Sequence, residues 1–162
     1  MSTHNPGNFF LPHDFEEEDS NNPWNPTQIQ GKVLYQKSID IINITQTIID
    51  LIPDEDAEDV TKALMNQNVM TVAVKIIGSI NSEPLYTLLM EAAVIIKVNI
   101  CELKAQLWVC EEIHNIDAVY TNVLRDEIEN FRRLFVEWVQ IFDKKNDCPD
   151  EWHLFNDPNS IS

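Results

Sequence analysis

Apolar residues recur at helical spacing along most of this chain, and the strongest pattern runs from Pro84 to Ile113. Apolar positions at steps of three and four mark one face of a helix. This stretch contains two such series, and a helix with two apolar faces needs two partners. We expect the chain's own fold to cover one face and another copy of the chain to cover the second, which carries Val94, Val98, Cys101, Ala105 and Trp108.

Three further stretches share this periodicity, so the predicted helices span about residues 28–52, 56–81, 83–113 and 117–143. The second helix also has two apolar stripes. We assign to the oligomer interface the stripe that carries Met65, Val69, Val72 and Ile76.

Local signals mark where these helices begin and end. Thr27 and Ser82 are placed to cap the first and third helices, and Pro53 ends the first. The fourth helix has a regular apolar seam made by Tyr120, Leu124, Ile128, Phe131, Phe135, Trp138 and Phe142.

Four long helices with short connections predict an all-α fold, an antiparallel up-and-down four-helix bundle. The bundle is expected at residues 27–143, between an acidic tail (1–26) and a C-terminal tail (144–162), both extended. Aromatic residues in such tails are candidate contacts for a partner protein, a neighbouring subunit or the chain's own bundle. These residues are Phe9, Phe10, Phe15, Trp24, Trp152 and Phe155.

The formal charge of −16 disfavours negatively charged partners. A phosphate backbone is repelled by such a chain unless basic residues cluster locally. The alternative to a protein partner is therefore a nucleic-acid patch made by Lys62, Lys75, Arg125, Arg132 and Arg133.

The remaining sequence features indicate a reduced, soluble protein. Cys101, Cys110 and Cys148 are odd in number and show no CxxC spacing, which favours free thiols. The first residues lack the basic and apolar regions of a signal peptide, and charged residues interrupt every stretch long enough to span a membrane. We expect a cytoplasmic location and no membrane partner.

No catalytic set emerges from the sequence. Glu111 and His114 form one Glu-x-x-His motif, but a di-iron bundle needs two such motifs and further carboxylates. Cys110 lies one turn before His114, without an identifiable third group to orient the histidine. A glycine-rich phosphate loop is also missing. We expect no enzymatic activity, no cofactor and no metal.

Two amides interrupt the apolar third helix, at Asn99 and Gln106. They could line a pore or a ligand cavity, or form a buried amide pair that specifies the register of the helices. The buried pair is the interpretation we favour.

Two helices resemble a known family. Tyr35, the Gln36-Lys37 pair and Ile52-Pro53 have the spacing that opens the four-helix-bundle family named for 23S ribosomal RNA intervening sequences. The third helix matches a second motif of that family at Glu102, Leu103, Gln106 and Leu107, so the resemblance covers about residues 33–142. The chain departs from the family in its second helix, where the residues from Gln67 to Ile80 lack the arginine pair and the closing Ala-Glu-Gly.

The family is similar in fold to the accessory variability protein of diversity-generating retroelements, a basic pentameric ring that assists a reverse transcriptase and contacts nucleic acid. The resemblance therefore implies a ring-shaped homo-oligomer, such as a pentamer. We expect a non-catalytic, oligomeric scaffold or partner-binding module. The alternative is a nucleic-acid accessory protein of the reverse-transcriptase type.

Overall fold

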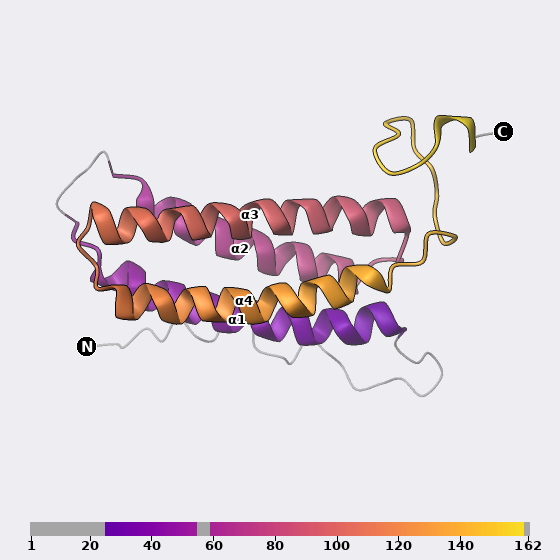
Figure 1. Ribbon diagram of the computed structural model, residues 1–162. Coiled ribbons are helices and arrows are strands. Elements are labelled where there is room, and N and C mark those ends of the chain that lie inside the picture. Colours follow the sequence, from indigo (N-terminus) through magenta and orange to yellow (C-terminus); the bar gives the residue numbers. More distant parts are fainter. Residues whose placement is uncertain (1–24, 55–58, 161–162) are drawn as a thin grey trace, which may run out of the picture.

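A computed structural model describes residues 25–54 and 59–160, and this part of the chain is all-helical (Figure 1). It contains four long helices, α1 (Pro26–Leu51), α2 (Thr61–Ile80), α3 (Tyr86–Glu112) and α4 (Ala118–Gln140), and a short 3-10 helix, η3 (Pro158–Ser160). The predicted all-α fold with four helices is confirmed. None of the described helices is both long and apolar enough to cross a membrane.

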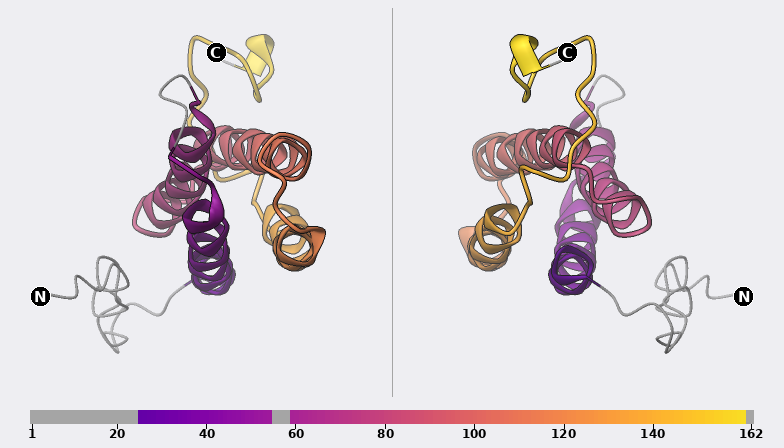
Figure 2. Two further views of the ribbon diagram at one scale, coloured as in Figure 1. Left: turned by 90° about the vertical axis from the view of Figure 1, so that its left-hand side faces the viewer. Right: turned by 90° about the vertical axis from the view of Figure 1, so that its right-hand side faces the viewer.

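The four helices pack around one core, and each lies beside two others. α2 packs closely against both α1 and α3, and α4 packs closely against α1 but less closely against α3. The views along the bundle in Figure 2 show α3 and α4 on one side of the molecule. The looser contact between α3 and α4 is the feature of the fold that positions the candidate site.

Trp138 closes one end of the core. Its side chain is fully buried, and its indole Nε1 donates a hydrogen bond of 3.0 Å to the backbone oxygen of Thr27. Gly31 of α1 permits this packing, because a Cβ atom at that position would lie 2.8 Å from the side chain of Ile80. Nearby, Gln28 Nε2 donates to the backbone oxygen of Ile80 at 3.0 Å. These contacts join the start of α1 to the ends of α2 and α4.

The cap of α1 and the first residue of α2 differ from the prediction. α1 begins with a capping box in which Asn25 and Gln28 bond each other's backbone, so Thr27 lies inside the first turn and is not the cap. α2 begins at Thr61, five residues later than predicted. Asp59 precedes it and accepts a hydrogen bond of 2.8 Å from the Thr61 backbone nitrogen.

The N-terminus of α3 is capped by a residue distant in sequence. The predicted cap, Ser82, instead donates to the backbone oxygen of Gly78. Asp147 binds the start of α3 through both carboxylate oxygens, with Thr87 N at 2.9 Å and Thr87 Oγ1 at 2.8 Å. The neighbouring Asn146 also bonds this end of the helix, through the backbone nitrogen of Tyr86.

The C-terminal segment is therefore attached to the bundle through Asn146 and Asp147. It is not an extended tail from residue 144 onward, as was predicted. After Asp147 the chain continues as turns and the η3 helix, and it stands off the end of the bundle where α3 begins (Figure 1). We call residues 148–160 the C-terminal arm.

Candidate functional site

A groove of about 420 Å³ lies between α3 and α4. Its floor is apolar, because large apolar side chains of both helices face each other there. The two helices pack too loosely to bury these side chains fully. Ile96 is fully buried, whereas Phe135 is only partly buried. The apolar residues that line the groove are Ile96 and Ile100 of α3 and Ile128, Phe131, Phe135 and Val136 of α4.

The rim of this groove is basic. Lys97 and Lys104 line it from α3, and Arg125 and Arg132 line it from α4, together with one acid, Glu129. The two lysines are seven residues apart, two helical turns, and so lie on the same face of α3. Four of the 11 lysines and arginines of an acidic chain thus meet at one groove.

The cations of the rim differ in how they are paired. Arg125 pairs with Glu111, and Arg132 forms a two-bond contact with Glu129, Nε to Oε2 at 2.8 Å and Nη2 to Oε1 at 2.6 Å. Hydrogen bonding from Arg132 lowers the pKa of Glu129 to about 2. In contrast, no described acid lies within ion-pair distance of Lys97 or Lys104. The α3 side of the rim therefore has positive charge available for a ligand.

An exposed apolar stripe runs along α3 next to the groove. All five residues predicted on the second face of this helix are exposed: Val94 (45%), Val98 (47%), Cys101, Ala105 and Trp108 (59%). Cys101 also lines the groove, so the two surfaces adjoin. We call these five residues the α3 outer stripe.

The corresponding assignment on α2 is corrected by the structure. Met65, Val69, Val72 and Ile76 are buried in the core of the bundle and offer no surface to another copy. The other stripe of α2 faces outward instead, with Met70 and Val74 exposed. Both stripes are apolar, and the periodicity alone does not say which one faces α1 and α3.

The predicted basic patch does not form one surface. Lys62 and Lys75 lie on α2, which is not a neighbour of α4, where Arg125, Arg132 and Arg133 lie. Lys62 pairs with Asp54, and Arg133 approaches Glu129 at 3.6 Å. Lys97 and Lys104 of the groove rim were not among the predicted residues. Their seven-residue spacing beside Ile96 and Ile100 is the signal that could have revealed them.

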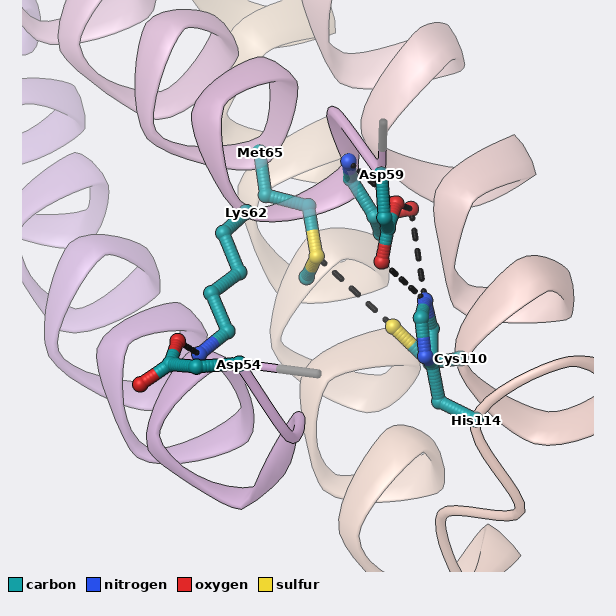
Figure 3. A network of polar contacts seen from close by, with 7 residues as sticks. Asp54, Asp59, Lys62, Met65, Cys110 and His114 are labelled. Atoms are coloured by element: carbon teal, nitrogen blue, oxygen red, sulfur yellow. Dashed lines mark hydrogen bonds and ion pairs between the residues drawn. The ribbon is translucent and has the colours of Figure 1, made fainter. Parts of the chain in front are cut away.

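A second polar cluster joins the start of α2 to the end of α3 (Figure 3). Asp59 Oδ2 lies 2.9 Å from His114 Nε2, and Asp59 Oδ1 accepts a hydrogen bond of 2.5 Å from Thr61 Oγ1. These bonds from Thr61, with a smaller contribution from His114, lower the pKa of Asp59. The cluster fastens two helix ends together.

Cys110 does not pair with His114. Its thiol is fully buried and contacts Met65 Sδ at 3.7 Å, and burial raises the thiol pKa to about 11 (Figure 3). A thiol in that state is a poor nucleophile at neutral pH. Cys110 and His114 therefore do not form a nucleophile–base pair in this conformation.

The Glu-x-x-His motif is also divided between two contacts. Glu111 accepts hydrogen bonds from Thr121 and Arg125 of α4, whereas His114 turns to Asp59. Hydrogen bonding from Arg125, and then from Thr121, lowers the pKa of Glu111. Within residues 25–54 and 59–160, no group of three or more His, Cys, Asp or Glu side chains could hold a metal ion.

The aromatic residues predicted as tail contacts differ in how exposed they are. Trp152 is 82% exposed, whereas Phe155 is half-buried and shares a pocket with Tyr86 and Lys144. Phe9, Phe10, Phe15 and Trp24 lie outside the described residues.

Comparison with known proteins adds no relative: no protein-family model, no curated protein and no solved structure matches the chain. The resemblance to the 23S intervening-sequence family stays a prediction.

Proposed function

We propose that this protein is a non-catalytic helical-bundle scaffold that binds a partner protein and assembles with copies of itself. The observation that carries the proposal is the α3–α4 groove, with its apolar floor and basic rim, beside the α3 outer stripe. Interfaces combine an apolar centre with a polar rim, and complementary charge selects the partner. The surface fits a protein segment whose apolar side chains are flanked by acids.

The α3 outer stripe is the proposed contact between copies of the chain. Exposed apolar residues are unremarkable singly, but a continuous stripe commonly marks an interaction site. A ring-shaped assembly of antiparallel up-and-down bundles is the form we propose. The bonds from Gln28 to Ile80 and from Trp138 to Thr27 support this chain direction, since they bring the start of α1 to the ends of α2 and α4.

The test of self-association is the double variant Val98→Glu/Ala105→Glu. Both positions are exposed, so the charges cost little in the folded monomer but oppose burial between copies. We expect the wild-type protein to sediment as an oligomer and the variant as a smaller species. Val119→Glu, at an exposed apolar position of α4 outside the stripe, is the matched control. A wild-type monomer, or an unchanged mass in the stripe variant, would contradict the assignment.

A role as a nucleic-acid accessory protein is the second candidate. It is favoured by the lysines of the rim, which lack acidic partners among the described residues and face Arg125 and Arg132 across the groove. The net charge of −16 opposes it. RNA binding that weakens steeply with salt and disappears in Lys97→Ala/Lys104→Ala would favour this role. We expect negligible RNA binding even at low salt.

We propose a cytoplasmic location for this function. The three cysteines support it because all are free thiols.

A further inference from the structure

The C-terminal arm presents two large apolar side chains to solvent. Trp152 is 82% exposed and Leu154 is 67% exposed, while Phe155, which shares a pocket with Tyr86 of α3, is half-buried. Such exposure of a tryptophan is unusual, because the transfer of a large aromatic side chain out of water lowers the free energy. The arm therefore has the composition of a ligand rather than of a solvated loop.

Hydrogen bonds hold the arm in a defined turn. Asp150 Oδ1 accepts from the backbone nitrogens of Trp152 at 3.0 Å and His153 at 3.2 Å. His153 Nδ1 lies 2.9 Å from Asn156 Oδ1, and Asp147 fixes the base of the arm to α3. A ligand that is ordered before binding loses less conformational entropy when it binds.

The charges of the arm are opposite to those of the α3–α4 groove. The arm contains Asp150, Glu151 and Asp157, and no lysine or arginine. The groove carries four cations and one acid around an apolar floor. Apolar side chains flanked by acids are the ligand that such a groove fits, and the chain itself supplies one.

We propose that the C-terminal arm of one copy inserts Trp152 and Leu154 into the α3–α4 groove of a second copy, where its acids approach Lys97 and Lys104. This inference rests on the proposed function and names the partner of that site. Within one chain the arm stands off the bundle (Figure 1). Trp152 and Leu154 are both exposed there.

The contact would be head-to-tail, because the arm and the groove are different surfaces. After one such contact the donor copy still has a free groove and the acceptor copy still has a free arm. Repeated contacts of this type close into a ring or extend as a filament. The groove adjoins the α3 outer stripe through Cys101, so arm and stripe would belong to one continuous interface.

The first test removes the two anchors with Trp152→Ala/Leu154→Ala. We expect self-association, measured by sedimentation velocity over a concentration series, to weaken about thirty-fold, as for truncation of a tryptophan at the centre of an interface. Ile29→Ala/Val33→Ala removes two exposed apolar side chains of α1 and is the matched control, with no change expected. Circular dichroism establishes that each variant is folded.

The second test exchanges charges between the two surfaces. Lys97→Glu/Lys104→Glu and Glu151→Lys/Asp157→Lys alter exposed positions, and each pair should weaken assembly alone. The four changes combined in one chain should restore it, because a direct interaction makes the effects non-additive. Additive losses would overturn the proposal.

The outcomes separate this inference from the proposed function. An oligomer that survives loss of Trp152 and Leu154 but is broken by Val98→Glu/Ala105→Glu overturns the arm contact and leaves the scaffold function standing. Loss of assembly on deletion of residues 1–20, with the arm variant unaffected, would assign the groove to the acidic N-terminal segment and also overturn the inference. A wild-type monomer at every concentration overturns both the arm contact and self-association.

Discussion

The core of the bundle contains a buried hydroxyl group that makes no hydrogen bond within the described part of the chain. Thr45 of α1 is fully buried, and its Oγ1 has no hydrogen-bond partner within the described part of the chain. A buried hydroxyl without a partner loses its bonds to water and gains none in return. Replacing it with an apolar group of similar shape should therefore stabilise the fold.

We expect Thr45→Val to raise the free energy of unfolding by about 1 kcal/mol. Thr47→Val is the matched control, because Thr47 is exposed on the same helix and donates to the backbone oxygen of Asn43. Urea denaturation at one protein concentration measures both. Destabilisation by Thr45→Val would show that the hydroxyl has a partner.

Asp59 links stability to pH. Its folded-state pKa is lowered, so its contribution to stability is present above its ordinary pKa of 3.8 and is lost as the pH falls through the lower, folded-state value. We expect Asp59→Asn to cost about 1 kcal/mol at pH 7, because the amide oxygen can still accept from Thr61 but the carboxylate charge and its contact with His114 are lost.

The difference between Asp59→Asn and wild type should shrink as the pH falls below 3.8, the ordinary value for this carboxyl. Asp54→Asn is the control, since Asp54 is 93% exposed in its contact with Lys62. A pH-independent difference would mean that Asp59 acts by packing and not through its charge.

The burial of side chains was predicted best for α4, where the apolar residues form a single seam. Leu124, Ile128, Phe131, Trp138 and Phe142 of the α4 seam are buried as predicted. The other seam residues depart from it: Phe135 is partly buried at the groove, and Tyr120 is 45% exposed near the start of the helix.

The two amides of α3 were only partly understood from the sequence. Gln106 accepts a hydrogen bond of 3.1 Å from Asn68 of α2, while Asn99 donates to Ile95 of its own helix. Gln106 therefore forms an amide pair that joins α3 to α2, whereas Asn99 bonds its own helix, and the sequence pattern of one helix does not identify the partner Asn68.

At the scale of the elements, α3 depends on the C-terminal segment for its start. Leu85, its N-cap residue, makes no side-chain hydrogen bond to the helix, and Asp147 performs that role from 60 residues away. Carboxylates at a helix N-terminus satisfy free backbone N–H groups and interact favourably with the helix dipole.

We expect Asp147→Ala to lower the free energy of unfolding by about 1 kcal/mol. Asn159→Ala, in the same segment but bonded to Asp157 alone among the described residues, should have little effect. Hydrogen exchange at the Thr87 amide gives a local measurement, and faster exchange in Asp147→Ala is the expected result. Unchanged protection would contradict the capping role.

The groove could not be predicted from the sequence, because it depends on how closely two helices pack. Helical periodicity identifies apolar faces, but it does not give the separation between two helices. The apolar seam of α4 was expected to be buried in a core, and only the looser packing of α3 and α4 in three dimensions leaves Phe135 partly exposed between basic residues. The same limit explains the reversed assignment of the two stripes of α2.

At the scale of the whole molecule, charge is distributed unevenly. The chain carries −16 overall, yet its α3–α4 groove is basic and its C-terminal arm contains only acids among strongly charged residues. Net charge of one sign keeps copies apart, whereas local complementary surfaces select a defined contact. Self-association of this protein should therefore strengthen when salt screens the general repulsion, up to the concentration at which it screens the groove contact as well.

Native mass spectrometry of the gently purified protein tests the central claim, that the chain is an oligomeric scaffold, most directly. The account predicts one assembly whose mass is a whole multiple of 18.7 kDa and which carries no nucleic acid. A lone species of 18.7 kDa across the concentration range would contradict it.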